Sequence, residues 1–125
     1  MPDSETSSLR VLVVDDEEKF RKISKKNLEG RGFAVEVAEA GEEAIAKIYN
    51  FDPKVVLLDV MMPRLTGDEL VKMIIDWKPE TQVIMVSANL SQEAEEECFR
   101  NGAYAYIKKP VKFDQLAETI RQAVF

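Results

Sequence analysis

The chain has 125 residues, of which 46% are hydrophobic and 32% are charged, as in an ordinary globular protein. This length suffices for one domain with a sizeable core but is short for two. The net charge of −6 opposes direct binding to nucleic acid, which needs clustered lysine and arginine. There is no histidine and only one cysteine, Cys98, so an internal disulfide, a His-based zinc site and histidine acid-base catalysis are excluded.

The first eight residues, MPDSETSS, are small, polar and unpatterned, so residues 1–8 are predicted to form a flexible leader. This start lacks the basic and apolar regions of a signal peptide. No stretch of the sequence approaches the roughly 18 to 20 apolar residues that span a bilayer. We therefore expect a cytoplasmic protein without membrane contact, whose folded domain covers residues 9–125.

From Leu9 onward, short apolar runs alternate with segments of helical periodicity. The runs predicted to be strands are LRVLVV (9–14), FAVEVA (33–38), KVVLL (54–58), QVIMV (82–86) and AYAYI (103–107). A helix is predicted after each strand. Near-continuous apolar strands separated by helices indicate a parallel sheet covered on both faces, and right-handed crossovers restrict the topology to doubly wound α/β forms.

Most of the predicted helices carry an apolar stripe. The third stripe consists of Leu70, Met73, Ile74 and Trp77, which recur at helical spacing. The fourth helix, around SQEAEEECFRNG, is strongly acidic, and Cys98 belongs to its thin apolar side. We expect Cys98 to be a small core residue and the glutamates to form a solvated face.

Polar residues stand where several of the predicted strands end. Asp15 and Asp16 follow the first strand, Asp59 follows the third, Ser87 ends the fourth, and the fifth leads to Lys109. Taken alone, Asp15 and Asp16 fit a solvated helix start equally well. In an open parallel sheet, however, ligands bind beyond the carboxyl ends of the strands. If the first and third strands are neighbours, as in the flavodoxin-like order, the three aspartates converge on one pocket.

Three convergent carboxylates repel one another, and a hard divalent cation relieves that repulsion. Mg²⁺ suits best, because it takes oxygen ligands and keeps waters for an incoming phosphate. We therefore predict that Asp15 and Asp16 hold Mg²⁺. An ionised aspartate is also a nucleophile toward phosphorus, so Asp59 is predicted to accept a phosphoryl group. Lys109 and Ser87 are predicted to bind the oxygens of that group.

Four motifs, in this order and at this spacing, resemble the receiver domains of two-component response regulators, from Leu9 to Val124. VLVVDDE resembles the first strand and acid pair, LLDVMMPRLTG the phosphorylation-site loop, MVSA the hydroxyl switch, and GAYAYIKKP the aromatic and Lys-Pro ending. The resemblance implies a single-domain flavodoxin-like fold, with a five-stranded parallel sheet in the order 2-1-3-4-5 and five helices. Two departures, Ser87 for the more frequent Thr and Val111 where Phe often stands, remove no required chemical group.

The same resemblance implies a fuller metal site. Its ligands are then Asp15 or Asp16, Asp59 and the backbone carbonyl of Met61. The Lys109-Pro110 bond is expected to be cis, which only an X-Pro bond adopts at low cost. A cis bond there aims the lysine at the pocket.

The resemblance also implies partners and a switch. The phosphate is expected to come from a sensor histidine kinase or a small phosphodonor. The chain is expected to be a signalling domain that promotes its own phosphorylation and dephosphorylation at Asp59, and not an enzyme. Phosphorylation is expected to draw Ser87 toward the phosphate and to let Tyr106 turn inward. The surface of the fourth helix, fifth strand and fifth helix would then change, and a second copy or an output partner is expected to bind there.

Other function classes remain as alternatives. One is a Mg²⁺-dependent phosphatase with an aspartyl nucleophile, although its familiar form has a second Asp where this chain has Met61. Another is a constitutive interaction module of the same fold, which the intact set of acids, lysine and hydroxyl disfavours. A nucleotide or flavin binder is disfavoured because the sequence has no GxxxxGK and no GxGxxG after the first strand.

Overall fold

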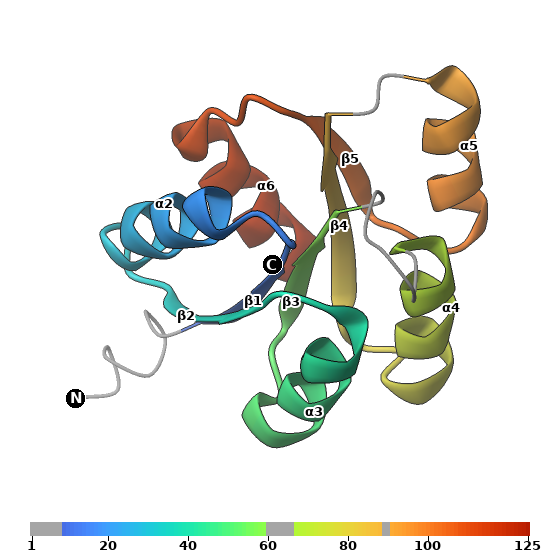
Figure 1. Cartoon of the computed structure of the whole chain (residues 1–125), viewed down its shortest axis with the longest axis horizontal. Helices are drawn as coiled ribbons and strands as arrows, with labels where there is room; N and C mark the ends of the chain where they lie inside the picture. Colours follow the sequence, from blue (N-terminus) through green and yellow to red (C-terminus); the bar gives the residue numbers. More distant parts are fainter. Residues whose placement is uncertain (1–8, 60–66, 89–90) are drawn as a thin grey trace.

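A computed structural model of the chain describes residues 9–59, 67–88 and 91–125. Within these ranges one sheet runs through the middle of the molecule, with helices on both of its faces (Figure 1). The leader predicted at residues 1–8 and the predicted metal ligand Met61 lie outside the described residues.

The sheet has five parallel strands in the order β2-β1-β3-β4-β5, which confirms the predicted doubly wound topology. The strands are β1 (Arg10–Val14), β2 (Ala34–Ala38), β3 (Val55–Leu58), β4 (Gln82–Ser87) and β5 (Ala105–Lys108). The described ranges contain the helices α2 (Glu18–Glu29), α3 (Gly41–Phe51), α4 (Gly67–Trp77), α5 (Gln92–Arg100) and α6 (Phe113–Val124). None of these helices has the combined length and apolarity that crossing a bilayer requires.

The core has two halves, because successive residues of the central strands point to opposite faces of the sheet. Leu12, Val56 and Met85 belong to the half that contains buried residues of α3, α4 and α5. Val11 and Val55 belong to the half that contains buried residues of α2 and α6. Both faces are therefore covered (Figure 1), which explains why these strands are almost entirely aliphatic. Cys98 is fully buried in the first half, as the sequence predicts.

The apolar stripe of α4 differs from the predicted one. The helix buries Leu70, Val71 and Ile74, whereas Met73 and Trp77 are each 41% exposed. The Trp77 ring instead stacks on Tyr49 of α3, with ring centroids 6.0 Å apart and planes 13° from parallel. The prediction was wrong at these positions because Val71 and Met73 both fit helical spacing beside Leu70 and Ile74, and only the rotation of the helix on the sheet decides between them.

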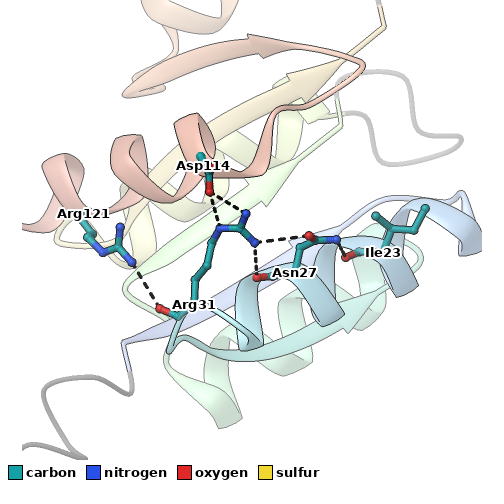
Figure 2. A network of polar contacts seen from close by, with 5 residues as sticks. All are labelled: Ile23, Asn27, Arg31, Asp114 and Arg121. Carbon is teal, nitrogen blue, oxygen red and sulfur yellow. Dashed lines mark hydrogen bonds and ion pairs between the residues drawn. The ribbon is translucent and has the colours of Figure 1, made fainter.

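A polar network joins the carboxyl end of α2 to α6 (Figure 2). Arg31, which follows α2, donates to Oδ1 of Asp114 from Nε at 3.1 Å and from Nη2 at 2.7 Å. Its Nη1 also donates to the backbone oxygen of Asn27 at 2.9 Å. From the other end of α6, Arg121 donates to the backbone oxygen of Arg31 at 3.3 Å. The network thus connects both ends of α6, the helix that follows Lys109, to the α2 side of the molecule.

Candidate functional site

Two aspartates lie at the same edge of the sheet, each directly after the carboxyl end of a strand. Asp15 follows β1 and Asp59 follows β3, and these strands pair in a register that places Val14 opposite Leu58. The Asp59 N–H donates to the backbone oxygen of Val14 at 3.1 Å, and the Asp15 N–H donates to that of Ala38 at 3.1 Å. Because the backbone is held on both sides, the two carboxylates have fixed positions although they are only 1% and 7% exposed, respectively.

Asp15, Asp16 and Asp59 form a group that we call the acid cluster. Each contributes a carboxylate oxygen, and these oxygens all lie within 4.8 Å of one another. Asp15 and Asp59 are buried, while Asp16 is exposed, so the cluster opens to solvent on the Asp16 side. A set of hard oxygen donors with open access fits a small divalent cation such as Mg²⁺, which binds one or two carboxylates and keeps several waters.

Lys109 supplies the counter-charge of the acid cluster. Its Nζ lies 2.7 Å from Oδ2 of Asp15, 3.5 Å from Oδ2 of Asp59 and 3.8 Å from Oε1 of Glu17. The lysine follows β5, where its N–H donates to the backbone oxygen of Ser87 at 2.9 Å, and its bond to Pro110 is cis, as expected. Sequence positions far apart are thus brought into one ionic site.

The electrostatics of the site reflect burial and charge together. Burial raises the pKa of Asp15, while the hydrogen bonds from Lys109 and from the Glu17 N–H oppose that rise and the Asp59 carboxylate adds to it. Burial alone would lower the pKa of Lys109, but its hydrogen bond to Asp15 and the nearby carboxylates raise it overall. Lys109 is therefore an ammonium at neutral pH, and a further cation beside Asp15 would lower the pKa of that carboxyl group.

Ser87 and Tyr106 meet on neighbouring strands. Ser87 ends β4 and is fully buried, and Tyr106 lies on β5, which pairs with β4. A hydrogen bond joins the two hydroxyls, and burial raises the pKa of the Tyr106 phenol in spite of it. The Tyr106 ring also packs against the half of the core that contains Met85. The expected switch residues are thus in contact with each other in this structure.

Comparison with known families matches residues 11–121 to the response regulator receiver domain. The chain belongs to this family. It is 37% identical over 106 residues to the transcriptional regulatory protein ResD of Bacillus subtilis (strain 168), a match that covers 85% of this chain and 44% of ResD. It is 34% identical over 113 residues to the response regulator MprA of Mycobacterium sp. (strain KMS), covering 90% of this chain and 49% of MprA. The receiver domain thus spans about half, or less, of these relatives.

Solved structures agree with this assignment. The receiver domain superimposes on a CheY-like response regulator receiver domain protein from Methanospirillum hungatei JF-1 with a TM-score of 0.89 at 34% identity, covering 94% of both chains. A second match is the CheX-CheY-BeF3-Mg+2 complex from Borrelia burgdorferi, with a TM-score of 0.87 at 28% identity over 94% of this chain and 90% of that one. The chain is therefore a signalling domain of the two-component type, with the CheY-like fold that the sequence predicts.

Most of the predicted site residues of this receiver domain gather at one edge of the sheet. Asp15, Asp16 and Asp59 form the acid cluster and Lys109 contacts two of them, whereas Ser87 lies at the end of the next strand and bonds Tyr106. Lys108, the neighbour of Lys109 in the sequence, is exposed.

Sequence reasoning missed two residues that touch this site. The ring of Phe20 lies under Lys109, with the ring centroid 4.2 Å from Nζ. Arg21 donates from Nη1 to the backbone oxygen of Asp15 at 2.8 Å. Their position, one helical turn after the acid pair, is a weak signal, and the apolar character of Phe20 at helical spacing predicts packing rather than contact with a cation. The two residues give the start of α2 a direct role in shaping the site.

Proposed function

We propose that Asp59 is the phosphoryl acceptor of this receiver domain and that phosphorylation depends on Mg²⁺. The observation that carries the proposal is the arrangement of the acid cluster around Lys109, in which two buried carboxylates lie within 3.5 Å of one ammonium. A buried carboxylate at the carboxyl end of a central strand, with a cationic partner on one side and solvent on the other, is suited to receive a group from outside.

The chemistry follows from the charges. A carboxylate oxygen of Asp59 forms a bond to phosphorus while the bond from phosphorus to the donor breaks, and the donor leaves with that electron pair. No base is needed, because the attacking carboxylate is already ionised. Lys109 neutralises charge on the transferred oxygens, with Ser87 as a hydrogen-bond donor once phosphorylation draws its hydroxyl toward them.

The proposed metal ligands are Asp15, Asp16, Asp59 and the backbone carbonyl of Met61, of which Met61 is proposed from the family resemblance alone. When bound, Mg²⁺ supplies positive charge beside the phosphoryl oxygens. The Borrelia burgdorferi CheY complex, whose name includes both BeF3 and Mg+2, supports this choice of ion. The donor set of this chain supports it independently, since all three side chains offer hard oxygen ligands.

The proposed output is a change of surface. Ser87 and Tyr106 connect the acid cluster to β5, and phosphate binding by Ser87 would break the hydroxyl contact between them. The α5, β5 and α6 surface is the proposed place where a second copy or an output partner binds. The proposed phosphodonor is a sensor histidine kinase. The proposed location of the chain is the cytoplasm, where ATP-dependent kinases act. The proposed domain covers residues 9–125 and follows a leader at residues 1–8.

The decisive experiment is labelling with acetyl phosphate in the presence of Mg²⁺, followed by intact mass measurement. We expect one phosphoryl adduct on the native chain and on Asp76→Asn, a matched control at an exposed position of α4. We expect no adduct on Asp59→Asn, nor on the native chain when EDTA replaces Mg²⁺. An unchanged adduct on Asp59→Asn would refute the assignment, and continuous turnover of phosphoesters without an adduct would favour the phosphatase alternative.

A further inference from the structure

Lys109 has two kinds of partner in this structure. On one side are carboxylates, with Asp15 at 2.7 Å and Asp59 at 3.5 Å. On another side is the ring of Phe20, whose centroid lies 4.2 Å from Nζ. A cation within about 6 Å of a ring centroid is attracted by the negative face of the ring, and the attraction grows as water is removed. The Lys109 side chain is only 16% exposed, so water screens this contact little.

The ring of Phe20 has apolar surroundings. Phe20 lies in the first turn of α2, which begins at Glu18, and it packs against the half of the core formed with α2 and α6. Its ring lines an apolar cavity of about 420 Å³ together with Pro110, Val111 and Phe113, and Lys109 borders the same cavity. The ring therefore has apolar neighbours besides Lys109.

The two kinds of partner respond differently to a metal ion. A cation bound to Asp15 and Asp59 would compete with Lys109 for their oxygens. A benzene ring is no ligand for a hard cation, so the Phe20 contact would remain available to the ammonium. The ring also attracts the ammonium without neutralising it, which leaves the full charge for phosphoryl oxygens. Lysine has a flexible four-carbon stem. Contact with the Phe20 ring would restrict this stem in advance, so less conformational entropy would be lost when the Lys109 ammonium binds phosphate.

We propose that Phe20 is a positioning residue for Lys109: its ring holds the ammonium beside the pocket while Mg²⁺ occupies the carboxylates. This inference rests on the proposed role of Lys109 in phosphorylation of Asp59. It differs from simple core packing in one testable respect. Packing requires an apolar side chain of suitable volume at position 20, whereas positioning requires an aromatic ring.

The first test compares phosphorylation rates of variants of the 125-residue chain with acetyl phosphate at saturating Mg²⁺. Phe20→Leu keeps an apolar side chain but removes the ring, and Phe20→Tyr keeps the ring. Phe113→Leu is the matched control, because it removes a ring from the same cavity, whereas the ring that lies under Lys109 is that of Phe20. We expect Phe20→Leu to be slower by about threefold to tenfold, as loss of a shielded cation–π contact implies. The phosphorylation rates of Phe20→Tyr and Phe113→Leu should stay within about twofold of the native rate.

The second test does not depend on phosphorylation. A proton over the face of an aromatic ring has its NMR signal shifted upfield, so the ε-methylene signal of Lys109, assigned by its loss in Lys109→Gln, reports the contact directly. With Mg²⁺ present, we expect the upfield shift in the native chain, Phe20→Tyr and Phe113→Leu, and its loss in Phe20→Leu. If circular dichroism shows that Phe20→Leu is unfolded, Phe20→Met, which also lacks a ring, takes its place.

The outcomes separate this inference from the proposed function. An unchanged Lys109 signal in the folded ring-free variant, or a native phosphorylation rate in it, overturns the positioning role while Asp59 remains the acceptor. Absence of any adduct on the native chain refutes the proposed function, and the NMR comparison still decides whether the ring holds the lysine. A rate loss in Phe113→Leu equal to that in Phe20→Leu also overturns the inference, because it assigns the effect to packing of the cavity.

Discussion

Lys109 Nζ lies 2.7 Å from Oδ2 of Asp15, although the two residues are 94 positions apart in the sequence. Strands β1 and β5 are not neighbours in the sheet, because β3 and β4 lie between them. The lysine therefore reaches along the carboxyl edge of the sheet, and Asp59 at the end of β3 lies close to its path at 3.5 Å. One ammonium is shared between two buried carboxylates, so the acid cluster keeps an excess of negative charge.

That excess predicts stabilisation by Mg²⁺. A ligand that binds only the folded state raises the free energy of unfolding by about 1.4 kcal/mol at ten times its dissociation constant. We expect the melting temperature of the native chain to rise with Mg²⁺ concentration, measured by circular dichroism. The rise should be lost or strongly reduced in Asp15→Asn and Asp59→Asn and retained in Asp76→Asn. An equal rise in all four proteins would place the ion elsewhere.

Removal of the lysine charge should destabilise the metal-free protein. Lys109→Gln leaves the buried carboxylates of Asp15 and Asp59 without their ammonium, and breaking a buried pair in this way costs about 3 kcal/mol. Lys108→Gln is the matched control, because Lys108 is exposed and such surface changes usually stay within about 0.5 kcal/mol. Urea unfolding in EDTA measures both. Equal stability of the two variants would show that the ionic contacts of Lys109 contribute nothing to folding.

Arg31 and Asp114, the two charged partners in the network between α2 and α6 (Figure 2), should contribute unequally to the free energy of unfolding. Asp114 is 91% exposed and contacts only Arg31 in the network drawn, whereas Arg31 is 30% exposed and also donates to the backbone oxygen of Asn27. We expect Arg31→Ala to lower the free energy of unfolding by about 1 kcal/mol and Asp114→Ala by about half as much. The Asp114 effect should shrink in high salt. Urea unfolding that finds the larger loss in Asp114→Ala would contradict this ranking.

The strands and the positions of the acids could be predicted from the sequence for a simple physical reason. Strands covered on both faces must be almost wholly aliphatic, so VLVV and VVLL stand out, and the first polar residue after each marks the edge of the sheet. What the residues alone could not decide was that β1 and β3 are neighbours. The convergence of Asp15 and Asp59 depends on that pairing, which the family resemblance supplied and the register confirms.

Contacts that depend on side-chain direction could not be predicted. Phe20 fits an apolar helical stripe equally well whether or not its ring meets a cation, and its contact with Lys109 requires both the tilt of α2 and the path of the chain after β5. Trp77 was assigned to the core because its spacing fits, yet the stack with Tyr49 places it at the surface between α3 and α4. Periodicity identifies the buried side of a helix only to within the rotation that neighbouring helices impose.

Tyr106 offers a prediction in the alkaline range. Burial raises the pKa of its phenol above the ordinary value of about 10, although the hydrogen bond with Ser87 opposes the rise. The folded state then holds this proton when the unfolded state has released it, so the contribution of Tyr106 to stability falls as the pH rises from the ordinary pKa to the raised one. We expect the stability of the native chain relative to Tyr106→Phe, measured by urea unfolding, to fall above about pH 10.

Ser87 gives this prediction a matched variant. Ser87→Ala removes the hydrogen bond that lowers the pKa of the phenol, so the absorbance change of Tyr106 should move to still higher pH. Subtracting the alkaline titration of the double variant Ser87→Ala/Tyr106→Phe isolates this absorbance change. The Tyr106 titration in the native chain is isolated in the same way with Tyr106→Phe. A Tyr106 titration at or below the ordinary pKa would contradict the effect of burial, and one that does not move when Ser87 is replaced would mean that the two hydroxyls are not in contact. In that case Ser87 would be free to meet phosphate without first leaving Tyr106.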